Sequence, residues 1–286
     1  MAKKRVVVMV NDKDSCNISC AHCFLPFTGK RSPRETLQLV DRLRNDGYDV
    51  TIAGSETLMD PGYLAAYERA GQRYLLTNGL RLKQDPGLFD ALQRYGITEL
   101  RMSLHFGIQE ALHSVPQRIV GDVCRDAKPR GFRVLISTTI TPENYRLVPE
   151  MAGYTREIGA DGIKFIKYVK SGSAHTESRR ALSDEERREF FELVDQARSR
   201  YGKDELELLI HGNFGPRRGT RGERLAQCNE YCPAGRSFFA IDPQNNVYGC
   251  PFLMEQPIGK LTGGGIEVTH DLHGGKRGSC LTDFLS

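Results

Sequence analysis

Three cysteines close together, Cys16, Cys20 and Cys23, constrain this chain more than any other feature of its sequence. They are spaced C-x3-C-x2-C and follow the apolar run from Arg5 to Val10, which predicts a buried β-strand. Three thiolates on a loop at the end of a strand can hold a metal centre. They leave one iron of a four-iron cluster without a protein ligand, and an open coordination position is what a reactive metal site needs.

A zinc site or a disulfide framework would also bring cysteines close together. Structural zinc sites usually have four ligands, with cysteines in paired C-x2-C units. Disulfides persist mainly in secreted proteins. The apolar run from Arg5 to Val10 is too short for a signal peptide or a membrane span. We therefore predict an iron–sulfur site in a cytoplasmic protein.

The cysteine loop is similar to the cluster loop of radical S-adenosylmethionine (SAM) enzymes. In that family, three cysteines hold a [4Fe–4S] cluster and SAM chelates the open iron. The resemblance implies that Cys16, Cys20 and Cys23 are the cluster ligands. The family usually has an aromatic residue before the last cysteine, where this chain has His22.

The composition is that of a globular protein, because 39% of the 286 residues are hydrophobic and can form a sizeable core. The formal charge of +4 is too small for this length to predict binding to nucleic acid or to a membrane. Seven of the 8 cysteines gather in two groups, which favours metal binding over disulfides. Cys124 is separate from both groups and lies among apolar residues of a predicted helix, so we expect it in the core.

Predicted strands alternate with predicted helices along the first part of the chain. The strands are residues 5–10, 48–53, 73–77, 99–104, 132–140 and 161–169. Regular alternation predicts a parallel sheet with right-handed crossovers. We predict an α/β fold with a partial (β/α)6 TIM-like barrel, as in the radical SAM core. Residues 1–202 would form this core with a linker helix, and residues 203–286 a C-terminal extension.

Small and polar residues follow the predicted strands, at the edge where parallel α/β folds bind ligands. The stretch 54–57 resembles the Gly-Gly-Glu-Pro stretch whose backbone holds the amino group of SAM in this family, although it differs at Ser55 and Thr57. Hydroxyl groups on the fourth and fifth strands would bind the ribose and the carboxylate, or would only cap and fill the barrel. The candidate SAM-binding residues are Gly54, Ser55, Glu56, Asn78, Ser103, Ser137 and Thr139.

A second cysteine group, Cys228, Cys232, Cys250 and Cys280, lies in the C-terminal third. Residues 237–249 predict a hairpin that brings Cys232 and Cys250 toward the same end. This region resembles the SPASM/Twitch extension of radical SAM enzymes, which holds an auxiliary [4Fe–4S] cluster, but the usual closing C-x2-C pair is missing. The resemblance implies that Cys228, Cys232 and Cys280 are ligands. Cys250 is either a further ligand or a thiol that donates a hydrogen atom to a substrate radical.

The resemblance also implies the chemistry. The reduced cluster would cleave SAM, and the 5′-deoxyadenosyl radical would take a hydrogen atom from the substrate. The cluster loop begins too early for a preceding peptide-binding domain, which favours a small-molecule substrate. The spare thiol and the general likeness lead us to expect an aminoglycoside epimerase in antibiotic biosynthesis. It would act as in the conversion of neomycin C to neomycin B, with Cys250 as the hydrogen donor.

Three alternatives remain open at this point. They are a radical SAM dehydrogenase of an aminocyclitol or sugar alcohol, a peptide-modifying radical SAM maturase, and a non-catalytic iron–sulfur or zinc protein. A polycationic substrate would need carboxylates near the strand ends, and four are available: Asp12, Asp14, Glu56 and Asp60. We also expect an external electron donor such as a flavodoxin or a ferredoxin.

Overall fold

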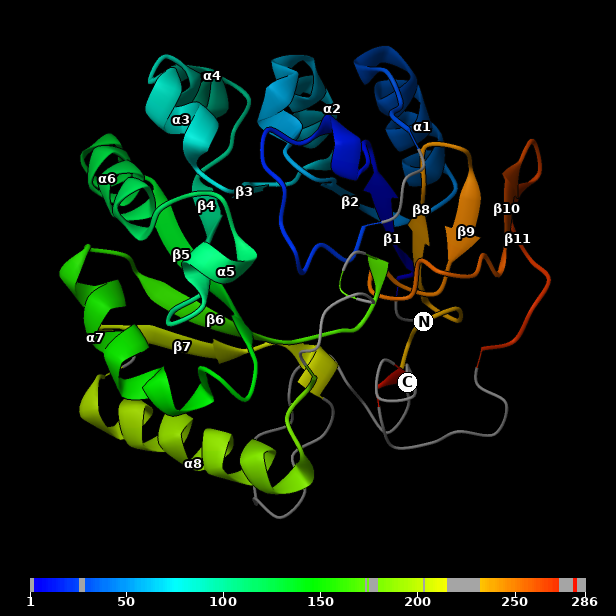
Figure 1. Cartoon of the computed structure of the whole chain (residues 1–286). Coiled ribbons are helices and arrows are strands. Elements are labelled where there is room, and N and C mark those ends of the chain that lie inside the picture. Colours follow the sequence, from blue (N-terminus) through cyan, green and yellow to red (C-terminus); the bar gives the residue numbers. More distant parts are fainter. Residues whose placement is uncertain are drawn as a thin grey trace.

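A computed structural model of the chain describes residues 3–25, 29–172, 174, 180–202, 204–214, 232–272 and 280–281 (Figure 1). All the strands predicted for the first part of the chain are present. They are β1 (Arg5–Met9), β2 (Asp49–Ala53), β3 (Tyr74–Thr77), β4 (Glu99–Ser103), β5 (Arg133–Ile140) and β6 (Gly162–Lys167). A further strand, β7 (Glu207–Ile210), follows them.

Helices follow most of these strands. The α-helices are α1 (Pro33–Asn45), α2 (Leu64–Ala70), α3 (Leu80–Gln84), α4 (Leu88–Arg94), α5 (Gln109–Leu112), α6 (Gln117–Ala127), α7 (Val148–Glu157) and α8 (Asp184–Arg200). Short 3-10 turns are Lys13–Ser15, Thr57–Met59, Pro61–Tyr63, Lys128–Arg130, Tyr145–Leu147 and Gly212–Phe214. Helices were expected to alternate with the predicted strands, and the structure confirms this alternation; α3 is an additional helix.

The start of α1 shows why the sequence folds as predicted. The Ser32 side chain accepts a hydrogen bond from the backbone N–H of Glu35, and the Glu35 carboxylate accepts the backbone N–H of Ser32. This capping box satisfies two N–H groups that have no partner inside the helix, while Pro33 supplies a preset first residue. Leu39, Val40 and Leu43 then form the buried face of α1.

The strands are divided between two sheets. One is parallel and runs in the order β3-β4-β5-β6-β7. The other has the order β11-β10-β9-β8-β1-β2, with the additional strands β8 (Phe238–Ile241), β9 (Asn246–Tyr248), β10 (Gly259–Thr262) and β11 (Gly265–Val268). Figure 1 shows the strands along an arc with the helices outside it. The parallel α/β fold is confirmed, and its completion as a partial barrel stays a prediction.

The predicted hairpin of the C-terminal part is present as β8 and β9. Its turn is organised by Asp242, whose carboxylate accepts the backbone N–H of Gln244 at 2.8 Å and of Asn246 at 2.9 Å. Strand β8 pairs in parallel with β1, so this hairpin extends the sheet that carries the first cysteine loop. Strand β7 pairs with β6 although it lies beyond residue 202. The division into two domains therefore remains a prediction.

The core lies between the sheets and the outer helices. Cys124 on α6 is fully buried within it, as expected. In the part of the chain that the structure describes, no helix combines the length and the apolar character that a membrane crossing needs.

Candidate functional site

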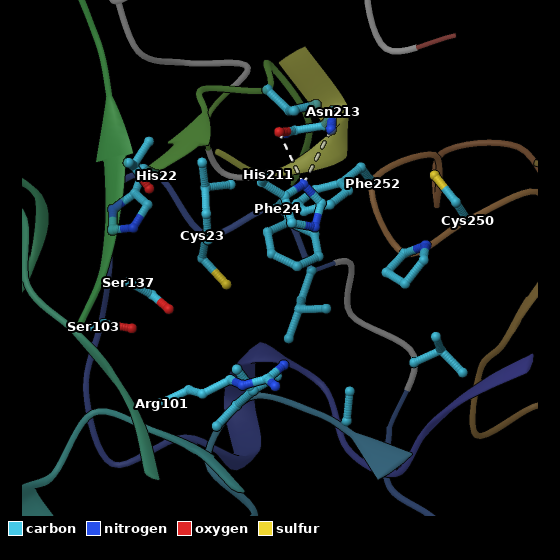
Figure 2. Close-up of a pocket in the computed structure, with 18 of the residues that line it drawn as sticks. His22, Cys23, Phe24, Arg101, Ser103, Ser137, His211, Asn213, Cys250 and Phe252 are labelled. Carbon is cyan, nitrogen blue, oxygen red and sulfur yellow. Dashed lines mark hydrogen bonds between the residues drawn. The ribbon is translucent and has the colours of Figure 1, made fainter. Parts of the chain in front are cut away.

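Both cysteine groups line the same cavity, which has a volume of about 490 Å³. The cysteines that line it are Cys16, Cys20, Cys23, Cys232, Cys250 and Cys280. Figure 2 shows Cys23 from the loop after β1 on one side of this cavity and Cys250 from the hairpin region on the other. The fold therefore brings together two groups that are far apart in the sequence. Cys228 lies outside the described residues.

Burial dominates the chemistry of the first cysteine group. It raises the pKa of the Cys16 and Cys23 thiols and, together with the neighbouring thiols, raises the pKa of Cys20 to about 12. A cationic metal centre has the opposite effect, because it stabilises thiolates. Among the described residues, no three His, Cys, Asp or Glu side chains converge on a point that a single ion could occupy. A four-iron cluster binds each thiolate through a different iron, so it does not need three side chains that converge on one point.

The stretch after β2 is held by its neighbours. The side-chain oxygen of Asn11 accepts the backbone N–H of Ser55 at 2.8 Å, and a Cβ on Gly54 would overlap this Asn11 oxygen. Gly54 and Ser55 line the cavity, and the Ser55 hydroxyl is buried without a partner among the described residues. The structure thus places the backbone of this stretch where it can approach a ligand.

Glu56 does not line the cavity, in contrast to Gly54 and Ser55. It is fully buried and is not part of the cavity wall. Its carboxylate accepts the Thr77 hydroxyl at 2.9 Å and the backbone N–H groups of Asn78 at 2.9 Å and Leu58 at 3.2 Å. Burial raises the pKa of this carboxyl group. Glu56 therefore ties the end of β2 to the end of β3, and its side chain is fully used by the protein.

The other SAM-binding candidates lie on the cavity wall. Ser103 of β4 is opposite Ser137 of β5 in the parallel register, and Figure 2 shows both hydroxyl groups pointing into the cavity. Thr139 and Asn78 also line it. The Asn78 side chain donates to the Asn17 side chain of the cysteine loop at 2.8 Å, so it also supports that loop.

Three histidines of the cavity wall were not predicted as site residues. His22, His105 and His113 form a row in which the ring centroids are 4.4 Å apart for His22 and His105 and 5.6 Å apart for His105 and His113. They come from three separate segments, so no sequence spacing connects them. The only local signal is that His22 directly precedes Cys23 and His105 closely follows a predicted strand.

The described part of the cavity wall is cationic. It carries the side chains of Arg5, Lys13, Arg101, Lys164 and Lys167 but no carboxylate. Lys164 lies opposite Ser137 in the register of β5 and β6. Burial, and next the charge of Arg101, lowers the pKa of Lys164 to about 8.

The carboxylates predicted to meet a cationic substrate do not line this described wall. Asp12 accepts the backbone N–H of Gly29 at 2.6 Å, and Asp60 accepts that of Gly62 at 3.0 Å. Asp14 is exposed on the turn before the cysteine loop, and Glu56 is buried as described above. The structure therefore does not bring these four side chains together around a ligand.

The second cysteine group is also compact. Cys280 donates a hydrogen bond to Cys232, which lowers the pKa of Cys232 to about 7. The nearby Cys250 has the opposite effect and raises this pKa. Cys250 is 7% exposed and packs in a small cluster with Ala234 and Leu281. This arrangement agrees with both roles that the sequence left open for Cys250.

An aromatic contact series joins the two cysteine groups. Phe24, next to Cys23, packs on Phe252, with ring centroids 4.9 Å apart, and Phe252 contacts His211 at 5.5 Å (Figure 2). These rings were not predicted either, because their contacts join distant parts of the chain.

No family model matches this chain. Among curated proteins it is similar to the mycofactocin maturase MftC of Mycobacterium tuberculosis (strain H37Rv). The two are 26% identical over 257 residues, which cover 84% of this chain and 63% of the relative. It is also similar to the Fe-coproporphyrin III synthase of Methanosarcina barkeri (strain Fusaro), with 28% identity over 206 residues, or 67% of this chain and 51% of the relative. The chain thus spans less than two thirds of the length of these relatives.

Solved structures share the fold. SuiB of Streptococcus suis bound to the precursor peptide SuiA has a TM-score of 0.69 at 14% identity, covering 89% of this chain and 61% of SuiB. The protein anSMEcpe with bound AdoMet and the Cp18Cys peptide has a TM-score of 0.64 at 16% identity, covering 90% of this chain and 77% of that protein.

Proposed function

We propose that the chain is a radical SAM enzyme, which binds a [4Fe–4S] cluster and SAM and abstracts a hydrogen atom from a substrate carbon. The observation that supports this most is the shared cavity, whose wall contains both cysteine groups. A substrate bound in this cavity would have the first cysteine group, where the radical is formed, on one side. Cys250, which can donate a hydrogen atom to the substrate radical, would be on the other side.

The first cysteine group and the polar residues near it would hold the cofactors. Cys16, Cys20 and Cys23 are the proposed cluster ligands. The proposed SAM contacts are Gly54, Ser55, Asn78, Ser103, Ser137 and Thr139, with Glu56 fixing the backbone between two of these segments. When bound, the cluster and SAM supply a 5′-deoxyadenosyl radical. The protein orients the substrate carbon and keeps water away from it, which the largely buried cavity wall favours.

The second cysteine group would determine the product. Cys232, Cys280 and Cys228 are the proposed ligands of an auxiliary cluster, and Cys250 is the proposed hydrogen donor. Its S–H bond breaks, the hydrogen atom joins the substrate radical from the opposite face, and the carbon is inverted. The sulfur radical left on Cys250 then takes one electron and one proton to restore the thiol. An external reductant such as a flavodoxin or ferredoxin supplies the electron. The net reaction is an epimerisation, and an aminoglycoside is the substrate class expected from the sequence.

A peptide-modifying maturase is the second candidate, and on substrate class the relatives favour it. One relative is named a maturase, and two proteins of the same fold have a peptide bound. The described cavity wall has no carboxylate for a polycation, so acidic contacts to an aminoglycoside would have to come from outside the described residues. Inversion by a thiol is compatible with either substrate class.

The test is turnover in heavy water with SAM and a reductant under anaerobic conditions. Neomycin C and peptides encoded beside the gene are the substrates to compare by mass spectrometry. Epimerisation predicts a product with one deuterium per inverted carbon, and a product two mass units lighter would instead mean dehydrogenation. Cys250→Ala should still form 5′-deoxyadenosine but should not invert the carbon. Loss of auxiliary iron in Cys250→Ala would contradict the donor role and make Cys250 a ligand.

A further inference from the structure

His105, in the loop that follows β4, has a fixed protonation pattern. It is 4% exposed, and its Nδ1 atom accepts the backbone N–H of Thr139 at 3.0 Å. A ring nitrogen that accepts a hydrogen bond carries no proton, so in the neutral ring the proton is on Nε2. Burial, together with His22 and His113, lowers the pKa of His105 well below its ordinary value, so the ring is neutral.

The Nε2–H group of His105 is buried and has no hydrogen-bond partner among the described residues. Leaving a buried donor unpaired costs about 1–3 kcal/mol. The surrounding loop is otherwise satisfied: Gln109 accepts the backbone N–H of His105 at 2.7 Å and donates to the Val115 carbonyl at 2.6 Å. An unpaired donor on the cavity wall, in a loop that is otherwise well bonded, favours an acceptor that a ligand brings into the cavity.

The position of the ring restricts which acceptor this is. His105 lines the cavity beside His22, which precedes the cluster ligand Cys23. Its Nδ1 partner Thr139 lies one inward-facing position beyond Ser137 on β5. Figure 2 shows His22, Cys23 and Ser137 around the same part of the cavity. The ring thus contacts His22 of the cysteine loop and Thr139, one of the proposed SAM contacts.

We propose that His105 is a SAM-binding residue whose Nε2–H group donates a hydrogen bond to an oxygen atom of SAM. This rests on the proposed function only in requiring that SAM binds in this cavity. The oxygen belongs to the methionine carboxylate or to the ribose, and both are acceptors of the kind that a neutral N–H group can bind. The backbone N–H of Thr139 holds the ring in the orientation that presents this donor.

His105→Asn removes the donor selectively, because the shorter amide can still accept the Thr139 N–H while nothing remains at the position of Nε2. His105→Phe keeps the ring volume and removes both hydrogen bonds. His211→Asn is the matched control. His211 also lines the cavity, and its Nδ1 atom lies 3.0 Å from the Asn213 side-chain oxygen and 3.2 Å from the Asn213 backbone nitrogen, but its Nε2 is not a buried unpaired atom.

The measurement is the dissociation constant of SAM by anaerobic equilibrium dialysis, on proteins with equal iron content. We expect both His105 variants to bind SAM about 10-fold to 100-fold more weakly than the wild type, as for a lost hydrogen bond to a charged or strongly polar group, and His211→Asn to match the wild type. Decarboxylated SAM separates the two acceptors. It should bind wild type and His105→Asn equally if the carboxylate is the partner, and unequally if the ribose is.

Unchanged SAM affinity in His105→Asn would overturn the proposal. If the midpoint potential of the SAM-free cluster shifted at the same time, the acceptor would be a cluster sulfide instead. Equal weakening in His211→Asn would also overturn it, because a general disturbance of the cavity would then explain the loss. Failure of the wild-type protein to bind SAM at all would contradict the proposed function itself, which keeps the two failures distinct.

Discussion

Lys164 offers a quantitative test of the electrostatics of the cavity. It lines the cavity on β6 and forms an ion pair with no carboxylate among the described residues. Burial and the charge of Arg101 lower its pKa from the ordinary value of 10.5 to about 8. A pKa that differs by one between the folded and the unfolded protein corresponds to about 1.4 kcal/mol, so the ammonium group destabilises the folded protein by about 3 kcal/mol at pH 7.

The sign of the pH dependence follows from this lowered pKa. Below pH 8 the folded protein carries the full cost of the charge, and the cost disappears as the pH rises toward the unfolded value of 10.5. Lys164→Met keeps the apolar stem and removes the charge. We predict that it raises the free energy of unfolding by about 3 kcal/mol at pH 7 and by about half of that near pH 9.5.

The assay is urea-induced unfolding of the cluster-free protein, followed by circular dichroism at several pH values between 7 and 9.5. Lys260→Met is the control, because Lys260 is an exposed residue on β10 and its replacement should change little at any pH. The reasoning predicts that the charge on Lys164 destabilises the folded protein. It would be refuted if Lys164→Met gave a gain in stability that does not depend on pH, or no gain at pH 7.

Three further predictions concern the loops at the strand ends. Gly54→Ala should lower the free energy of unfolding by about 1–3 kcal/mol and weaken SAM binding, since the new Cβ overlaps the Asn11 side chain; urea unfolding and dialysis measure both. Glu56→Ala should cost at least about 2 kcal/mol in the same unfolding assay, because three protein donors lose their acceptor. Cys16→Ala should lose the iron of the first cluster, whereas Cys124→Ala should retain all iron, as measured by iron and sulfide content. Normal iron in Cys16→Ala would contradict its role as a ligand.

The sequence predicts the strands and most helices because their signals are local. An apolar run such as Val6–Val10 and a capping box such as Ser32 with Glu35 each determine a structure within a few residues. The short α3 has no side-chain cap and was missed. The pairing of β8 with β1, which places the second cysteine group beside the first, was not predicted because no local pattern encodes which distant strands pair.

The parts of the candidate site that the sequence predicts are also those with a local sequence signal. The spacing of Cys16, Cys20 and Cys23 is a local signal, and so is the hairpin that precedes Cys250. His105 and Lys164 carry no such signal. Their importance comes from what surrounds them, an unpaired Nε2–H group in one case and an unneutralised ammonium group in the other. Both features depend on contacts between separate strands, so they appear only once the chain is folded.

The expected carboxylate site shows how position along the sequence can mislead. Asp12, Glu56 and Asp60 all lie near strand ends, where ligands bind in parallel folds. The same strand ends and turns leave backbone N–H groups without partners, and each of these side chains accepts at least one of them. A carboxylate that already accepts such hydrogen bonds has less capacity to bind a cationic substrate, and moving it would leave the donors unpaired. The charge that the described cavity presents to a substrate therefore comes from side chains that do not bind the backbone. Among these, Lys164 forms no ion pair with a described carboxylate, whereas Arg101 is paired with Glu99 at 2.6 Å.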